Sequence, residues 1–585
     1  MPKLKLPLHP ARASLLAFAL FLVGCASVNP GATPPETAAT APAVNATASE
    51  PEPEIEYGAF TEEQLYQTIV SELSGQQGDL EQASDNYYRL AFETRDIAIV
   101  RRASQFASVT GDINALVQLG LLWAELEPDN IDPHLMLSFQ LLDAGRFEDA
   151  VNHMADVIDL GGEMDFATLS ARSQRLPTSR RTRLIENLRQ LHGLYPEQQS
   201  IQYTIVELLS QNQQPEEALV ELQILRQNYG ESPRALLTEA RLLQGLEQAD
   251  RALRVLRNGV REFPEEKPLR FNYARLLIQE EEFDDALEQF EIILEQDPED
   301  YEVVYSAALL DMELEDYDQA LARLADLVEA DHRVSDSHFY MGYIHELQEQ
   351  PEQAIPHYRA VEVGAANFVA AQQQATRFAM ELGRFDEAHD WLVELSRGQP
   401  RLEIVFTNIE ANLLMQLEET ERAEAVLTDM LQRYPNDTDL LFTRVLLHDS
   451  RGDMESSERD LRRIIRLQPD DFRALNHLGY MLADRTARFQ EALELLEQAI
   501  ALAPDDPAVI DSLAWAQYKL GRYEDALQNL RRAFAAFPDH EVASHLGEVL
   551  WVMGREQEAL QVWEDALEET PDSPIINEAM ERLVQ

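Results

Sequence analysis

A small residue recurs about every 34 residues along most of the chain, and this spacing limits the possible fold more than any other feature. The series continues on both sides of a central run with steps that stay close to 34, which makes fifteen copies in 585 residues. A period of this length is typical of arrays in which one supersecondary unit stacks on the next. The fifteen positions are Ala83, Ala115, Ala150, Leu184, Ala218, Ala252, Ala286, Ala320, Ala354, Ala388, Ala423, Ser457, Ala492, Ala526 and Ala559.

Several copies also carry a glycine or a proline at a fixed place, with apolar residues between these marks. Apolar residues at three- and four-residue spacing predict two helices per copy. A glycine such as Gly383 ends the first helix, because it adopts the left-handed conformation that other residues resist. A proline such as Pro400, twelve residues after the repeated alanine, ends the second helix, because proline cannot continue a helix interior. Each copy is therefore predicted to be a helical hairpin.

This pattern resembles the tetratricopeptide repeat over residues 59–571. The resemblance implies an all-α fold, a tetratricopeptide α-solenoid built as a right-handed superhelix of about fifteen helix pairs. The first helix of each pair would line a concave groove. The second and fourth copies match least well, because Ala115 is offset and Leu184 replaces the small residue. Residues 572–585, with apolar residues on one helical face, are expected to form a C-terminal capping helix.

The N-terminal residues predict export and lipid anchoring. Residues 1–24 combine basic residues with a short apolar run, which is typical of a secretory signal peptide. The run ends at Leu22-Val23-Gly24-Cys25, which resembles the bacterial lipobox and implies cleavage before Cys25 and lipidation of its thiol. The alternative is an unmodified cysteine at the end of an ordinary signal peptide. Because no aspartate follows Cys25, the resemblance implies anchoring at the periplasmic face of the outer membrane.

Residues 25–58 are rich in alanine, proline and threonine and show no apolar periodicity. Such a composition cannot bury enough surface to fold, so this segment is predicted to be a disordered tether.

Composition and motifs exclude several functions. The chain has 105 acidic and 48 basic residues, a formal net charge of −57, which argues against a nucleic-acid partner. Its single cysteine excludes an internal disulfide and a multi-cysteine metal site. No metal-binding helix, phosphate loop or nucleophile elbow occurs, and the thirteen histidines are scattered. We therefore expect no catalytic residues, no metal site, no cofactor and no small-molecule substrate.

An aromatic strip is the candidate binding site. Residues fifteen positions before the repeated alanine are expected to face the concave groove, and in five successive copies they are mostly aromatic. With nearby arginines and an asparagine they would suit an extended acidic peptide. The alternative is that the rings pack between helices. The predicted groove residues are Tyr203, Leu237, Phe271, Tyr305, Phe339, Arg234, Arg241, Asn272 and Arg275.

A lipobox, a tether and a long repeat array together resemble the outer-membrane lipoprotein partner of a periplasmic carboxyl-terminal processing protease, the LbcA type. The resemblance implies a non-catalytic adaptor that binds this serine protease and delivers substrates to it, among them cell-wall hydrolases. It carries over no functional residue beyond Cys25. The alternative is a scaffold lipoprotein for envelope assembly or export, as in polysaccharide secretion or pilus assembly.

Overall fold

The computed structural model describes residues 60–584, and this part of the chain is entirely helical, with 31 α-helices, one short 3-10 helix and no strand. The predicted all-α solenoid class is thereby confirmed. The predicted signal peptide, Cys25 and tether fall outside the described residues. Within residues 60–584, every helix is too short or too polar to span a bilayer.

The chain divides into two compact units, one ending at Arg323 and the other beginning at Leu324. Helix α17 (Tyr317–Glu329) runs across this boundary. The described helices of the first unit are α2 (Glu62–Gln76), α3 (Leu80–Thr94), α4 (Ile97–Thr110), α5 (Ile113–Leu126), α6 (Ile131–Asp143), α7 (Phe147–Asp159), α8 (Ala167–Arg172), η2 (Ser173–Arg175), α9 (Thr178–Leu194), α10 (Gln199–Gln211), α11 (Pro215–Tyr229), α12 (Pro233–Gly245), α13 (Ala249–Glu262), α14 (Lys267–Gln279), α15 (Phe283–Gln296) and α16 (Tyr301–Glu313).

The second unit repeats the same hairpin organisation and ends with one extra helix. Its helices are α18 (Val334–Leu347), α19 (Pro351–Arg359), α20 (Phe368–Glu381), α21 (Phe385–Ser396), α22 (Pro400–Gln416), α23 (Thr420–Arg433), α24 (Thr438–Ser450), α25 (Met454–Leu467), α26 (Phe472–Arg485), α27 (Phe489–Leu502), α28 (Pro507–Lys519), α29 (Tyr523–Ala536), α30 (His540–Val552), α31 (Glu556–Glu569) and α32 (Pro574–Leu583).

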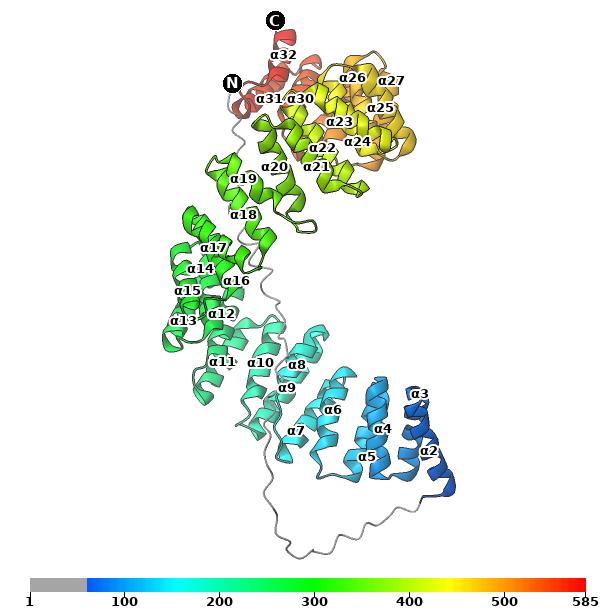
Figure 1. Cartoon of the computed structure of the whole chain (residues 1–585), viewed down its shortest axis with the longest axis vertical. Helices are drawn as coiled ribbons and strands as arrows, with labels where there is room; N and C mark the ends of the chain where they lie inside the picture. The colour runs from blue at the N-terminus through cyan, green and yellow to red at the C-terminus, as the bar shows by residue number, and fades with distance from the viewer. Residues whose placement is uncertain (1–59, 585) are drawn as a thin grey trace, which may run out of the picture. The chain divides into compact units, whose positions relative to one another are not determined.

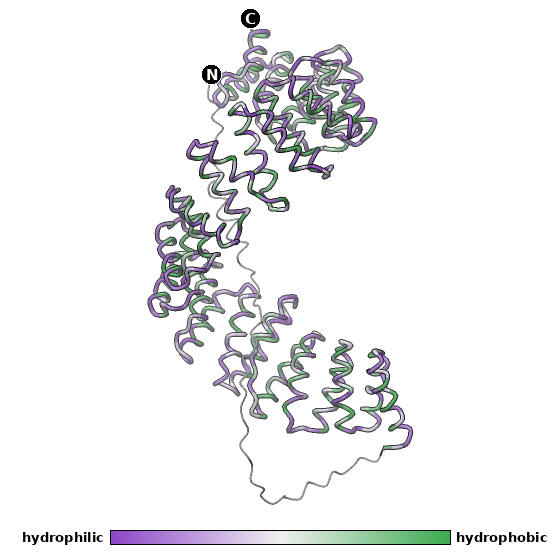
Figure 2. Tube along the Cα trace, viewed as in Figure 1, coloured by the Kyte–Doolittle hydropathy of each residue, from purple (hydrophilic) through white to green (hydrophobic). Residues whose placement is uncertain are grey.

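Within each unit, helices that follow one another in the chain lie side by side (Figure 1). Apolar and polar residues alternate along the helices, as Figure 2 shows, so each helix has an apolar side to bury. Helix α32 buries Ile576 and packs against α30, so it covers the last hairpin of the second unit. The fourth hairpin departs from the others, because α8 has only six residues.

The repeated small residue lies in the second helix of every hairpin and is buried there. All fifteen side chains are at most 8 % exposed, and most are fully buried. Such burial leaves room for a methyl group but for little more, since protein interiors are close-packed. Leu184, the one large residue of the series, lies on α9, in the hairpin whose first helix, α8, is shortened. Close packing of neighbouring helices therefore explains why the small residue recurs.

The repeated glycines lie at the ends of first helices, where the backbone adopts a left-handed conformation. Gly383 and Gly452 have φ angles of 76° and 71°, the left-handed conformation predicted for the end of the first helix. In several other repeats glutamate occupies the same place with a similar angle, for example Glu281 at 62°. The hairpin geometry is thus kept even where no glycine is present.

Candidate protein-interaction surfaces

The predicted aromatic strip lies on first helices of successive hairpins, as its spacing requires. Four of its members belong to the first unit, on α10, α12, α14 and α16, and Phe339 belongs to the second unit, on α18. Tyr203 and Tyr305 are each 4 % exposed, so their rings serve mainly to pack the helices. Leu237, Phe271 and Phe339 are half-buried and keep some accessible surface.

Specific contacts fix the orientation of two strip residues. The Tyr203 hydroxyl lies 2.9 Å from the Ser232 hydroxyl, and the Phe271 ring lies 5.7 Å from the ring of buried Phe290. Both contacts join helices of the first unit. Tyr203 and Phe271 therefore contribute to packing between helices, as the alternative interpretation expects. Binding of a partner to the strip stays a prediction.

The predicted polar residues beside the strip differ in how far they are free to bind. Arg234 lies over the Tyr203 ring at 4.3 Å and pairs with Glu207 at 3.2 Å. Arg275 donates to the Asn272 side chain at 3.1 Å. Arg241 is exposed and makes no hydrogen bond or ion pair with another described residue. Arg241 is therefore the strip arginine best placed to pair with an acidic partner.

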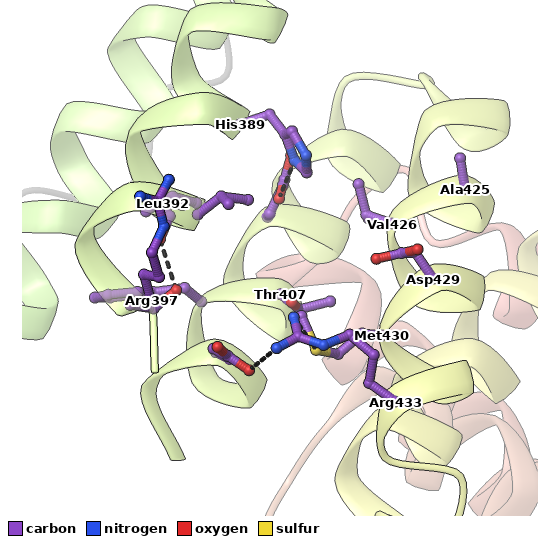
Figure 3. Close-up of a pocket in the computed structure, with 14 residues that line it drawn as sticks. His389, Leu392, Arg397, Thr407, Ala425, Val426, Asp429, Met430 and Arg433 are labelled. Atoms are coloured by element: carbon purple, nitrogen blue, oxygen red, sulfur yellow. Dashed lines mark hydrogen bonds and ion pairs between the residues drawn. The ribbon is translucent and has the colours of Figure 1, made fainter. Parts of the chain in front are cut away.

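A pocket of about 500 Å³ lies between α21, α22 and α23 in the second unit. Figure 3 shows Leu392 and Arg397 on one side, Val426 and Met430 on the other, and Thr407 between them. Its volume falls within the range that binds small ligands or single side chains, about 300–1,000 Å³. The sequence did not suggest this pocket, because its walls come from two neighbouring repeats.

Two buried carboxylates on α22 bind polar and charged side chains at the edge of this pocket. Glu410, 4 % exposed, lies 2.9 Å from Nδ1 of His389, and this hydrogen bond raises the pKa of His389. Glu403 accepts from Tyr434 at 2.7 Å and from Arg433 at 2.6 Å, which lowers the pKa of Glu403. Each of these two carboxylates is thus already paired with neighbouring side chains.

Among residues 60–584, nothing covers one apolar face of the first described helix. Leu65, Tyr66, Ile69 and Leu73 lie on α2, and their exposed fractions range from 49 % to 60 %. Positions 65, 69 and 73 are four residues apart and share one side of the helix. Contiguous exposed apolar surface makes this side of the helix a candidate interaction site. We refer to these four residues as the α2 face.

Stacked helical hairpins with a buried small residue in nearly every second helix define the tetratricopeptide-repeat class of proteins. Sequence comparison agrees: models of the tetratricopeptide repeat match residues 243–300, 277–340, 442–507 and 512–574. The chain is 40 % identical over 543 residues to the TPR repeat-containing protein PA4667 of Pseudomonas aeruginosa, covering 92 % of this chain and 90 % of that protein. This chain belongs to the tetratricopeptide-repeat family, whose arrays bind other proteins on extended surfaces.

Two further similarities are more limited. Cellulose synthase 2 operon protein C of Komagataeibacter xylinus is 29 % identical over 182 residues, which are 31 % of this chain and 14 % of that protein. A tetratricopeptide repeat protein from Parabacteroides merdae, known from a crystal structure, is 17 % identical, covers 43 % of this chain and 100 % of that chain, and gives a TM-score of 0.32. The family assignment therefore rests on the repeat models and the Pseudomonas relative.

Proposed function

We propose that this protein is a lipid-anchored, non-catalytic adaptor that binds a periplasmic carboxyl-terminal processing protease together with its substrates, cell-wall hydrolases, and promotes their proteolysis. The observation that carries the binding role is the α2 face, at least 49 % exposed at each of its four residues. The lipobox resemblance at Cys25 supports the anchor at the outer membrane. The protease as partner comes from the resemblance of the whole sequence layout.

Local concentration is the mechanism that fits an adaptor without a reactive site. When two proteins bind one tethered molecule, their encounter becomes intramolecular, at an effective concentration near the millimolar range. A protease and a hydrolase held on the same array would meet far more often than two proteins that diffuse freely. No chemical step is required of the adaptor itself.

Capture of the partner from solubilised envelopes, followed by mass spectrometry, tests the proposal. The double variant Ile69→Asp with Leu73→Asp places charges on the α2 face and should reduce recovery of a serine protease at least about tenfold. Leu194→Asp is the matched control, since Leu194 is 73 % exposed at the end of α9 and lies outside the α2 face. Equal recovery with the double variant and the control would overturn the assignment of this face.

The strip is tested separately with Arg241→Glu. This exposed arginine has no partner to lose among the described residues, so the substitution should leave the helical circular dichroism spectrum unchanged. Weaker capture of the hydrolase substrates would support the strip as a peptide site. Unchanged capture of every partner would remove Arg241 from the binding surface.

A scaffold for envelope assembly or export is the second candidate. The partial similarity to a protein named for a cellulose synthase operon favours it. The same capture experiment separates the two: a secretin or a glycan porin in place of the protease would support export. Hydrolysis of peptidoglycan or casein by the purified chain alone would contradict both adaptor proposals.

A further inference from the structure

Two histidines and an aspartate meet between α6 and α7 in the first unit. The His134 and His153 Nδ1 atoms are 3.1 Å apart. Oδ2 of Asp156 lies 2.9 Å from the first nitrogen and 3.2 Å from the second. Within residues 60–584, this is the one group of three or more histidine, cysteine, aspartate or glutamate side chains whose ligand atoms lie this close together.

The triangle has the size of one face of a tetrahedral metal site. Zinc binds imidazole nitrogen and carboxylate oxygen at about 2.0–2.1 Å, which places neighbouring ligand atoms about 3.3 Å apart. The three observed separations, 2.9, 3.1 and 3.2 Å, are within a few tenths of an ångström of that value. A small movement of the side chains would bring all three atoms to bonding distance of one ion.

The three atoms also lie at hydrogen-bonding distance. Where both rings carry their hydrogen on Nδ1, each can donate to Oδ2 of Asp156, and a metal ion would replace both hydrogens and bind all three atoms at once. The side chains of His134 and His153 are only 11 % and 17 % exposed, so water replaces few of their contacts.

The ninth repeat provides a comparison within the same chain. His338 and His357 lie 204 residues after His134 and His153, six repeats of 34, and their Nδ1 atoms are 3.2 Å apart. The residue that corresponds to Asp156 is Ala360. The same hairpin geometry thus brings two histidines together twice, and only the third repeat adds a carboxylate.

We propose that His134, His153 and Asp156 form a binding site for a divalent transition-metal ion of the zinc type, with water as the fourth ligand. Two imidazoles and one carboxylate suit Zn²⁺, Ni²⁺ or Cu²⁺ better than Mg²⁺ or Ca²⁺, which prefer oxygen ligands. The ion joins α6 to α7 within one hairpin. Asp156, whose side chain is 45 % exposed, faces the solvent and leaves a path for the ion to enter.

Calorimetric titration of the full chain with ZnCl₂, after treatment with EDTA and in the presence of excess MgCl₂, tests the site. We expect one tight equivalent of zinc per chain above the weak binding of surface acids. Asp156→Ala makes the third repeat resemble the ninth and should weaken this equivalent at least about tenfold, as should His153→Gln. His357→Ala, at the corresponding position of the ninth repeat, should leave it unchanged.

Cobalt gives a second, independent measurement. Co²⁺ bound in four-coordinate geometry absorbs visible light strongly, and this absorption should disappear in Asp156→Ala while far-ultraviolet circular dichroism is retained. The proposal is overturned if the unsubstituted chain shows no tight equivalent of zinc. It is equally overturned if Asp156→Ala and His153→Gln bind zinc as tightly as the unsubstituted chain, or if His357→Ala removes the tight equivalent.

Discussion

At the scale of single residues, one buried ion pair of the second unit shows how burial and charge compete. His545 on α30 and Asp511 on α28 have side chains 3 % and 8 % exposed, with Nδ1 of the histidine 2.9 Å from the carboxylate. Burial alone would lower the pKa of His545, but Asp511 and its hydrogen bond, helped by Glu541 and Glu548, outweigh it and raise the pKa. The ring also stacks on Trp515 at 4.0 Å.

This pair predicts a stability effect that depends on pH. Because the folded pKa of His545 lies above its unfolded value of about 6.5, the stabilisation is complete below that pH and is lost as the pH rises through the folded pKa. His545→Ala should therefore lower the free energy of unfolding by about 3 kcal/mol near pH 6, since it leaves Asp511 buried without a partner. The loss should be smaller at high pH.

Urea denaturation followed by tryptophan fluorescence at several pH values measures this difference. The comparison is between the unsubstituted chain and His545→Ala at each pH, so effects of pH on other groups cancel. A difference in unfolding free energy that stays constant from acidic to alkaline pH would show that His545 has the same pKa in the folded and the unfolded chain, and so gains no charge stabilisation from Asp511. The stacking on Trp515 would then be its main contribution.

At the scale of helices, the left-handed residues at the ends of first helices allow a second prediction. Glu281 has φ 62° and an exposed side chain, so Glu281→Gly removes the strain of a side chain in this conformation. The larger entropy of glycine in the unfolded chain offsets part of the gain. We expect a net increase in unfolding free energy of about 0.5–1 kcal/mol.

Two controls accompany this variant. Glu280→Gly changes the neighbouring residue, whose φ is −95°, and should destabilise by about 0.5–1 kcal/mol, since it gains nothing from glycine. Gly452→Ala should destabilise by about 1 kcal/mol, although a Cβ atom there would meet nothing within 4 Å. Thermal unfolding measures all three. A stabilised Glu280→Gly would contradict the conformational explanation.

How much of the fold followed from the sequence can be judged from the same positions. Glycine, proline and the small residue predicted fifteen hairpins because each acts through local geometry or one close contact. Leu184 indicated that the fourth repeat departs from the pattern, but the shortening of α8 depends on packing that no single residue encodes. Local signals were therefore sufficient for the fold class and insufficient for its irregular repeat.

The candidate surfaces were harder to predict. Periodicity placed Tyr203 on the correct helix, but its burial depends on Arg234 and Ser232 from the next hairpin.

The expectation of no metal site rested on the absence of short motifs, whereas His134 and His153 are nineteen residues apart on two helices. An alignment of the repeats places His338 and His357 at the same repeat positions as His134 and His153. This recurrence is the one sequence signal for the cluster of His134, His153 and Asp156.

At the scale of the whole molecule, acidic side chains greatly outnumber basic ones, so repulsion between like charges exceeds attraction between opposite charges. With 105 acidic and 48 basic residues, pairing every basic group still leaves many carboxylates without a partner. Arginines bridge neighbouring helices, as Arg488 does with Glu458 at 2.8 Å, but such pairs are partly exposed and each contributes less than about 1 kcal/mol. Repulsion among the remaining carboxylates destabilises the folded chain.

Salt should therefore stabilise this protein. Raising NaCl shortens the distance over which charges interact, from about 30 Å at 0.01 M to about 8 Å at 0.15 M, and weakens repulsion among many acids more than attraction in a few close pairs. The melting temperature, followed by circular dichroism, should rise steeply at low salt and level off by a few tenths molar. A steady rise without a plateau would indicate a surface-exclusion effect instead. A falling melting temperature would show that the arginine bridges outweigh the net charge of −57.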